Sequence, residues 1–215
     1  RSIAVPGYAG VALTAGGKMQ AISAGTAEFA PDGRPLRAFG PQVPVRIASI
    51  SKVAVALALH RLADQGLLRL DADVSDALGW RLRNPRHPDV PITIRQMMRH
   101  ESSLSDAGGY VGVLGGRQRD RIGPASFSAA APGMAFDYAN LNQALLGEVI
   151  EQVTGKRFDQ AVGELVFAPL GIEACFNWSG CRAETVAAGA VLYRKAPSDE
   201  GPWDAAGPWV PQVDA

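Results

Sequence analysis

The chain has 215 residues, of which 47% are hydrophobic and 20% charged, and its 21 Lys and Arg balance 21 Asp and Glu. This composition fits one large or two small globular domains and does not suggest disorder. Because no long block of like charge occurs, neither nucleic acid nor an anionic membrane is an implied partner, and a small-molecule substrate is the default expectation. No apolar stretch is long enough to predict a membrane span.

The first predicted elements are two strands. Residues 3–15 and 19–29 alternate apolar with small or polar residues on either side of an Ala-Gly-Gly-Lys turn at residues 15–18, which is typical of a hairpin. The chain begins at Arg1 rather than Met, which suits a processed or trimmed protein, and no targeting sequence can be read.

Residues 49–52 read Ser-Ile-Ser-Lys, the only Ser-x-x-Lys in the chain, and they open its most apolar helical run. On a helix, positions three apart share one face with Cβ atoms roughly 5–6 Å apart, so a Lys amine there can hydrogen-bond the Ser oxygen. A base beside a hydroxyl makes its oxygen a nucleophile. The spacing therefore indicates Ser49 as a candidate nucleophile and Lys52 as its base.

Ser49 has a second interpretation, as a helix N-cap, because Ser before an apolar periodic run commonly bonds the free backbone N–H groups. Lys52 fits that interpretation poorly. A cation in the first turn faces the positive end of the helix dipole, and a capping box would have Glu or Gln at this position. The residue type at position 52 thus favours the chemical interpretation.

Residues 53–59 are apolar on every side of the expected helix, which predicts a helix surrounded by protein. Lys52 would then lie at the edge of a dry core. Desolvation and the helix N-terminus both disfavour its ammonium form, which would make the neutral amine available as a base. The same helix end favours a developing oxyanion.

A second motif, Tyr138-Ala139-Asn140, is the only Tyr-x-Asn in the chain and precedes an amphipathic helix. The apolar positions of that helix are Leu141, Leu145, Leu146, Val149, Ile150 and Val153. In a structural interpretation Asn140 is the N-cap and Tyr138 a half-buried ring. In a chemical one, Tyr138 shares its proton with Lys52 and becomes a usable base, while Asn140 orients Lys52 or a substrate carbonyl.

Together these segments resemble the penicillin-recognising serine hydrolases, which include class C β-lactamases, the esterases similar to them, and DD-peptidase and D-aminopeptidase relatives. Residues 46–52 resemble the family's nucleophile segment, and residues 67–74 resemble the stretch after its nucleophile helix. Residues 92–100 resemble its ITIRxLLxH helix, and residues 132–156 the segment with Tyr-x-Asn. The resemblance covers roughly residues 5–195.

The resemblance implies an α+β fold, an α/β sandwich with an antiparallel sheet and an inserted, mostly helical domain of the β-lactamase/transpeptidase type. Residues 1–72 would form the N-terminal strands and nucleophile helix of the α/β domain. Residues 73–195 would form the helical domain, and residues 196–215 a loop-like tail.

Carried over position by position, the resemblance implies Ser49 as the acylated nucleophile, Lys52 as its base partner, Tyr138 as a proton shuttle and Asn140 as a substrate-binding or network contact. The implied chemistry is acyl transfer from an ester, amide or lactam, followed by release of the acyl group to water. No cofactor is implied. A periplasmic or secreted location is implied, with the cytoplasm left open, and the substrate among β-lactam, D-amino-acid peptide, amide and ester is not determined.

The chain departs from the family pattern in two places. Residues 100–104 read His-Glu-Ser-Ser-Leu where the family has HTSGL, so Ser103 stands where Gly is common. In addition, no Lys or His followed by Ser or Thr and then Gly occurs in the chain. In the family this third motif lies on a strand that supplies the second oxyanion-hole N–H, and losing one such donor costs about 100- to 1000-fold in rate.

From this gap we expect the family's C-terminal strands to be absent from this chain and a second polypeptide to complete the fold. Without those strands the nucleophile helix would expose an apolar face. Residues 195–215, rich in Pro, Gly, Asp and Ala, show no strand pattern. The two Gly-Pro-Trp repeats at residues 201–203 and 207–209 are either hooks onto another surface or parts of a plain loop.

Cys175 and Cys181 are spaced to close a small disulfide loop in an oxidising compartment, and two free buried thiols are the open alternative. His60, His87 and His100 are scattered and pair with neither Cys, so no metal site is expected. No Gly-x-Ser-x-Gly elbow occurs, which argues against a Ser-His-Asp triad and leaves His60 as a packing or surface residue.

Two other functions stay open. A protein that keeps this scaffold can bind a ligand and signal by occupancy without turnover. Alternatively, the chain is an inactive half of a split enzyme, whose activity would return when the missing polypeptide is added.

Overall fold

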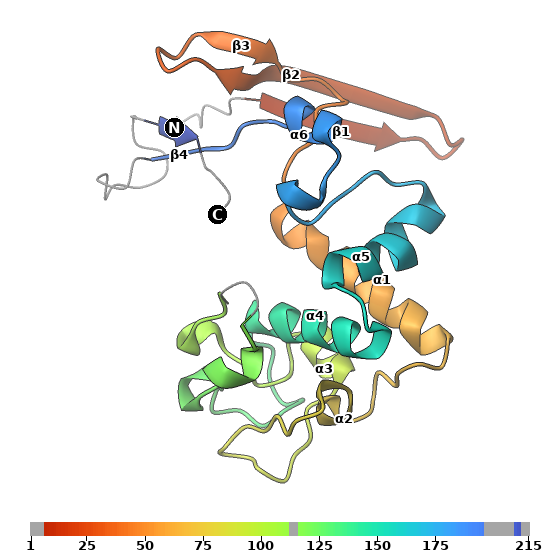
Figure 1. Cartoon of the computed structure of the whole chain (residues 1–215), viewed down its shortest axis with the longest axis vertical. Coiled ribbons are helices and arrows are strands. Elements are labelled where there is room, and N and C mark those ends of the chain that lie inside the picture. Colours follow the sequence, from red (N-terminus) through yellow and green to blue (C-terminus); the bar gives the residue numbers. More distant parts are fainter. Residues whose placement is uncertain (1–6, 112–115, 196–208, 212–215) are drawn as a thin grey trace. The chain divides into compact units, whose positions relative to one another are not determined.

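A computed structural model describes residues 7–111, 116–195 and 209–211. The chain forms two compact units, shown in Figure 1. One comprises Arg1–Arg46 and Phe176–Ala215, and the other comprises Ile47–Cys175. The helix that follows Ser49 therefore shares a unit with the later helices, and the domain boundaries after residues 72 and 195 stay a prediction.

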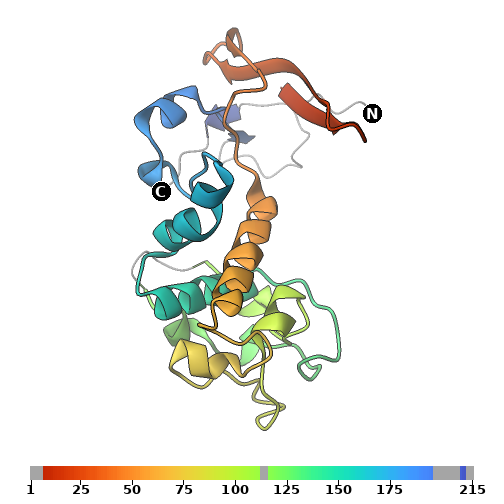
Figure 2. The same cartoon turned by 90° about the vertical axis from the view of Figure 1, so that its right-hand side faces the viewer.

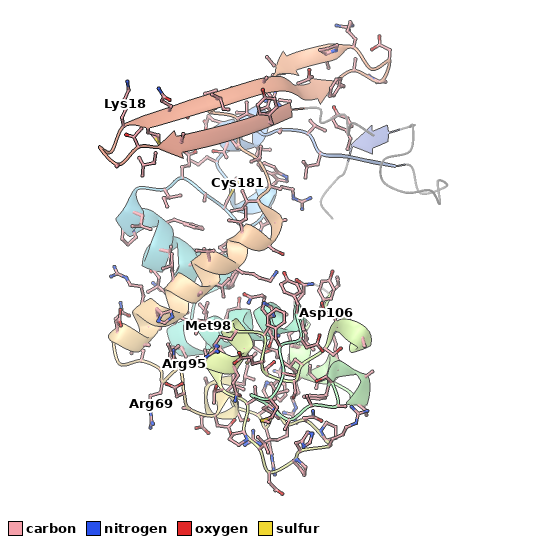
Figure 3. All side chains as sticks on the ribbon, turned by 180° about the vertical axis from the view of Figure 1, so that it is seen from behind. Lys18, Arg69, Arg95, Met98, Asp106 and Cys181 are labelled. Carbon is pink, nitrogen blue, oxygen red and sulfur yellow. The ribbon has the colours of Figure 1, made fainter. Side chains whose placement is uncertain are left out.

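The first unit contains a three-stranded antiparallel sheet, in which β2 (Met19–Phe29) lies between β1 (Gly7–Leu13) and β3 (Pro35–Ala38). This confirms the predicted hairpin within the described residues. At its turn, which Lys18 marks in Figure 3, the Thr14 N–H donates to the Lys18 carbonyl at 3.0 Å. Gly17 has a φ of +77°, which glycine adopts without steric cost.

The C-terminal part of this unit packs on the sheet through polar contacts. Its elements are η7 (Trp178–Gly180), α6 (Ala183–Ala188) and an antiparallel pair of strands, β4 (Tyr193–Lys195) and β5 (Trp209–Pro211). The Tyr193 hydroxyl accepts from the Phe29 N–H at 2.7 Å, and the Arg37 guanidinium donates to the carbonyl of Ala188 at 2.6 Å. Strand β5 lies in the tail expected to be loop-like, and the first Gly-Pro-Trp lies outside the described residues.

The second unit is helical, and it is the unit that contains Ser49. Its α-helices are α1 (Ser51–Asp64), α2 (Val74–Leu78), α3 (Ile94–Met98), α4 (Leu141–Thr154) and α5 (Phe158–Val162). Its 3-10 helical turns are η1 (Ala48–Ile50), η2 (Asp106–Gly108), η3 (Gln118–Arg121), η4 (Pro124–Ser126) and η6 (Ala168–Leu170). A π-helical turn, η5 (Gly163–Phe167), follows α5. Among the described helices, none is long and apolar enough to cross a membrane.

Helices α4 and α5 pack against α1, as Figures 1 and 2 show. The amphipathic pattern predicted for α4 is confirmed, since its apolar positions from Leu141 to Ile150 are buried. They form one core with Leu59 and Leu62 of α1 and with Met97 of α3, all fully buried. This core fixes the N-terminal ends of α1 and α4, where the two sequence motifs lie.

Helix α1 is buried on one face only. Ala58, Leu59 and Leu62 are buried, whereas Val53 is 60% and Leu57 44% exposed. Among the described residues protein therefore covers one face of this helix and not all sides, which corrects the expectation of a fully surrounded helix. Sequence composition showed that the helix is apolar but not which side is covered.

Helix α3 begins with a capping box. The Thr93 hydroxyl accepts from the Gln96 N–H at 3.1 Å, and the Gln96 side-chain oxygen accepts from the Thr93 N–H at 3.0 Å. These two bonds satisfy backbone donors that the helix itself leaves free.

We expect Thr93→Ala to lower the free energy of unfolding by about 1 kcal/mol, because the hydroxyl acceptor is lost. Thr93→Ser retains that acceptor and should stay near the wild-type value. Urea unfolding of the three proteins measures the difference, and equal midpoints for wild type and Thr93→Ala would contradict a role for the cap.

Candidate active site

Ser49 lies in the middle of the turn η1, two residues before α1 starts at Ser51. The N-cap position of α1 is Ile50, which makes no side-chain cap hydrogen bond. The interpretation of Ser49 as an N-cap is therefore wrong, and its hydroxyl is available for other contacts. The preceding residue, Ala48, has a φ of +44°, a conformation uncommon outside glycine.

Two polar groups contact the Ser49 hydroxyl. The Lys52 Nζ donates to Ser49 Oγ at 2.9 Å, and Ser49 Oγ and the Tyr138 hydroxyl lie 2.9 Å apart. Lys52 Nζ also donates to Asn140 Oδ1 at 3.0 Å. The structure thus brings together the four residues indicated by the two motifs, although their catalytic roles stay a prediction.

The Tyr138 ring is 46% exposed and lies close to the Lys52 cation, whose Nζ is 5.1 Å from the ring centroid. Hydrogen bonding from Lys52, and then from Ser49, lowers the pKa of Tyr138 below its ordinary value. Both bonds stabilise the phenolate more than the phenol. Tyr138 is therefore easier to deprotonate than a solvated tyrosine, as a base requires.

His100 supports the Tyr138 ring, a role that sequence reasoning missed. The two rings are stacked with centroids 4.4 Å apart, and His100 Nδ1 accepts from the Ala139 N–H at 3.2 Å. Burial, and then the charge of Lys52, lowers the pKa of His100. The imidazole is consequently held in its neutral form. The one sequence signal that could have indicated this role is the position of His100 at the start of the HTSGL-like segment.

Asp106 is the second residue that sequence reasoning missed. Its Oδ2 accepts from both the backbone N–H and the side-chain Nδ2 of Asn140, each at 2.9 Å. Its Oδ1 accepts from the Leu141 N–H, also at 2.9 Å. Asn140 occupies the N-cap position of α4 but makes no side-chain cap bond, so the Asp106 carboxylate caps this helix.

A buried polar pair holds the loop that carries His100 against α4. Ser102 Oγ donates to Asn142 Oδ1 at 2.6 Å, and Asn142 Nδ2 donates to the Ala139 carbonyl at 3.1 Å. Both side chains are buried, where hydrogen-bonded polar groups fix a single arrangement. The segment from Tyr138 to Asn140 is thereby held through both the N–H and the carbonyl of Ala139, which bond to His100 and Asn142.

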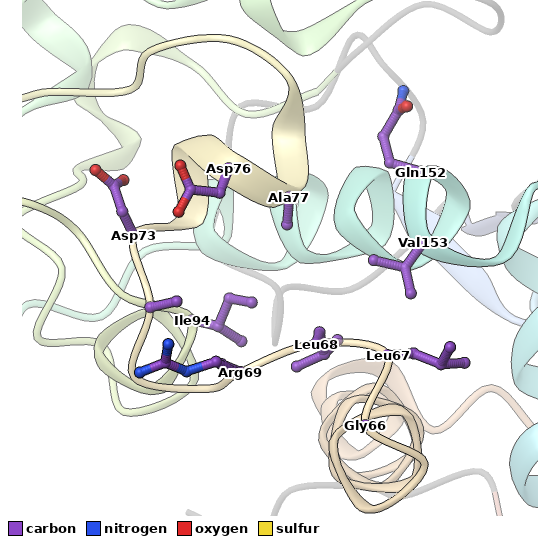
Figure 4. Close-up of a pocket in the computed structure, with 11 residues that line it drawn as sticks. Gly66, Leu67, Leu68, Arg69, Asp73, Asp76, Ala77, Ile94, Gln152 and Val153 are labelled. Atoms are coloured by element: carbon purple, nitrogen blue, oxygen red, sulfur yellow. The ribbon is translucent and has the colours of Figure 1, made fainter.

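A surface hollow elsewhere on the second unit does not include any of these residues (Figure 4). It is lined by residues 66–69, Ala72, Asp73, Asp76, Ala77, Ile94, Gln152 and Val153. The Asp73 carboxylate already accepts from the Ser75 N–H and from Arg83. Since the hollow includes none of the four motif residues, it is not the candidate site.

Neither cysteine is free, and both Cys175 and Cys181 are disulfide-bonded. The alternative of two free thiols is therefore wrong. His60 is exposed, which agrees with a surface residue rather than a member of a catalytic triad.

Comparison with known proteins shows the family. The Beta-lactamase family model matches residues 2–210, and the chain belongs to this family. The chain is 34% identical over 167 residues to esterase EstB from Burkholderia gladioli, covering 66% of this chain and 40% of EstB. It is 32% identical over 136 residues to the D-alanyl-D-alanine-carboxypeptidase/endopeptidase AmpH from Escherichia coli, covering 60% of this chain and 35% of AmpH.

Solved structures show the same fold. The hydrolase EstCE1, described as having promiscuous acyltransferase activity, aligns with a TM-score of 0.72 at 24% identity over 98% of this chain and 55% of its own. A class C beta lactamase from Rhodobacter sphaeroides aligns with a TM-score of 0.70 at 24% identity over 97% of this chain and 53% of its own. The α+β, β-lactamase-like fold expected from the sequence is confirmed.

We expect Tyr138 to titrate below the ordinary tyrosine value of about 10, because Lys52 stabilises its phenolate. Phenolate absorbance measured against pH, with the Tyr138→Phe curve subtracted, isolates this residue. In Lys52→Met the Tyr138 transition should move to higher pH. Lys18→Met, which alters the β1–β2 turn, is the matched control and should leave it in place. An unchanged transition in Lys52→Met would refute the coupling.

The neutral, buried His100 should make stability depend on pH. Its folded pKa lies below the unfolded value of about 6.5, so between these values the unfolded chain binds more protons. Stability is therefore lost as pH falls below about 6.5. Thermal unfolding from about pH 8 to about pH 5 should show a smaller decrease in Tm for His100→Asn than for wild type. The exposed His60→Asn should decrease like wild type, and parallel curves for all three would contradict the assignment.

Proposed function

We propose that this chain is a serine hydrolase of the β-lactamase-related type, which forms an acyl-enzyme on Ser49 from an ester, amide or lactam. The observation that carries the proposal is the 2.9 Å distance from Ser49 Oγ to both Lys52 Nζ and the Tyr138 hydroxyl. A serine beside two such groups can lose its proton as it attacks a carbonyl carbon.

In the proposed mechanism the Tyr138 phenolate, stabilised by Lys52, takes the proton from Ser49 as Oγ bonds to the substrate carbonyl carbon. The resulting tetrahedral intermediate collapses when Tyr138 returns that proton to the leaving alcohol or amine. Lys52 is kept at Ser49 by its second hydrogen bond, to Asn140 Oδ1. A water molecule, activated by the Tyr138/Lys52 pair, then attacks the acyl carbon and releases Ser49.

The substrate class follows from this chemistry and is supported by relatives. EstB is named an esterase and AmpH a D-alanyl-D-alanine-carboxypeptidase/endopeptidase. Ester and amide carbonyls share the acyl-transfer step, so the proposal covers both. The two disulfide-bonded cysteines support a periplasmic or secreted location, where disulfides persist.

The proposal includes a missing C-terminal portion, outside these 215 residues, that supplies the third family motif and that a second polypeptide could carry. Its support is the absence of any Lys/His-Ser/Thr-Gly triplet from the 215 residues. The exposed side chains of Ile50, Val53 and Leu57 give a further reason, because they present an apolar strip along α1 that another chain can bury.

The test is intact-mass analysis of the natively purified protein before and after treatment with a fluorophosphonate, a serine acylating agent. We expect a single adduct in wild type and none in Ser49→Ala. Ser51→Ala, two residues away, should keep the adduct, while Tyr138→Phe should form it about 10²- to 10⁴-fold more slowly because the proton acceptor is gone.

The same spectra show whether a second polypeptide co-purifies. Turnover of a chromogenic ester, absent in Ser49→Ala, would support hydrolysis beyond the acylation step. A wild-type chain that forms no adduct would overturn the proposal and leave the ligand-binding function.

A further inference from the structure

Asp106 makes three hydrogen bonds at the start of α4, and two of them go to one residue. The backbone N–H and the side-chain Nδ2 of Asn140 both donate to Oδ2 at 2.9 Å, and the Leu141 N–H donates to Oδ1. On its other side, Asn140 accepts from Lys52 Nζ through Oδ1 at 3.0 Å. The Asn140 amide therefore lies between a carboxylate and a cation.

This placement selects one of the two orientations of the amide. A carboxylate only accepts hydrogen bonds and a Lys ammonium only donates them. With Nδ2 toward Asp106 and Oδ1 toward Lys52, both contacts are satisfied. In the flipped amide, Oδ1 would face the carboxylate and Nδ2 would face Lys52, so both contacts would be lost together.

The Asp106 carboxylate is itself fixed by its turn. The Ser105 N–H donates to the Ser126 carbonyl at 2.9 Å, which ties the start of η2 to η4. A Cβ at Gly108 would lie 2.6 Å from Ser126 Oγ and 2.9 Å from the Ser126 backbone N, so η2 approaches η4 as closely as glycine permits. Asp106 is half-buried in this packing.

We propose that Asp106 is a positioning residue for the Ser49 chemistry, which fixes the Asn140 amide so that its oxygen holds Lys52 at Ser49. This inference rests on the proposed function, because its effect is on acylation of Ser49. Asp106 makes no hydrogen bond to Ser49, Lys52 or Tyr138 among the described residues, and its hydrogen bonds act on these groups through Asn140.

Asp106→Asn is the sharpest change, since it keeps the shape of the side chain and replaces one acceptor oxygen by a donor. The new NH₂ group would face N–H groups of Asn140 and Leu141, which are themselves donors, so it cannot accept their hydrogen bonds. We expect the rate of fluorophosphonate adduct formation at Ser49 to fall about 10- to 100-fold, because misplacement of a catalytic group costs up to that much. Thr93→Ala, which removes a cap from α3, is the control for lost stability and should acylate at the wild-type rate.

A double-mutant cycle separates positioning from helix capping. If Asp106 acts through the Asn140 amide, Asp106→Asn will slow acylation in the wild-type background and have little further effect in Asn140→Ala. If Asp106 only caps α4, the slowing will be the same in both backgrounds. Equal slowing, or no slowing in the wild-type background, would overturn the inference.

A second measurement does not depend on acylation. The side-chain amide protons of Asn140, assigned in an NMR spectrum by their loss in Asn140→Ala, should exchange with solvent faster in Asp106→Asn than in wild type. If wild type forms no adduct, the proposed function fails, and this exchange rate still decides the positioning role. An unchanged rate in Asp106→Asn would then overturn it.

Discussion

The hydrogen bond from Lys52 Nζ to Asn140 Oδ1 joins two helix N-termini that are 88 residues apart in the chain. Ser49 lies on the turn before α1, and Tyr138 lies just before α4. Their hydroxyls are within hydrogen-bond distance only if those two helix ends are held together. The packing of α4 against α1 brings the ends close, because Leu59 and Leu62 share a buried core with Leu145 and Leu146. The hydrogen bond between Lys52 and Asn140 then determines which side-chain atoms of the two helix ends are in contact.

Uncommon backbone conformations gather at the segments that carry these contacts. Within the described chain, the non-glycine residues with positive φ are Ala48, His100 and Ser103. Such conformations persist where the surrounding structure over-determines them. His100 is held by the Ala139 N–H, and Ser103 Oγ accepts from Asn84 Nδ2 at 3.2 Å. Ser103, with a φ of +65°, stands where the family pattern has Gly, and this conformation explains the preference for Gly there.

Some of the residues around Ser49 could be predicted from the sequence. These are the ones whose positions are fixed by their short spacing along a helix. Lys52 is one helical turn from Ser49, and Asn140 directly precedes a helix with a clear apolar period. Both motifs could therefore be recognised from neighbouring residues in the sequence. Asp106 was not, because it reaches Asn140 from a loop 34 residues earlier, and no periodicity records such a contact. The contact depends on the packing of η2 on η4, which is tertiary structure.

The fold shows the same division between local and tertiary information. The β1–β2 hairpin and the buried positions of α4 follow from alternation and helical period. The coverage of α1 does not, since Val53 and Leu59 are equally apolar and yet one is exposed and the other buried. Strand β5 is defined only by its pairing with β4, and three residues carry too little pattern to predict it.

An amide between Lys52 and Asp106 also has an electrostatic consequence. A carboxylate in direct contact with a Lys ammonium offsets much of its positive charge, so that the ammonium stabilises a neighbouring phenolate less. Asn140 gives Lys52 a hydrogen-bond acceptor without a full negative charge, and it keeps the carboxylate one residue further away. The same separation protects Tyr138, because the charge of Asp106 acts to raise its pKa, against the lowering by Lys52. The order Asp106, Asn140, Lys52 thus gives rigid positioning while leaving the cation free to stabilise the phenolate beside Ser49.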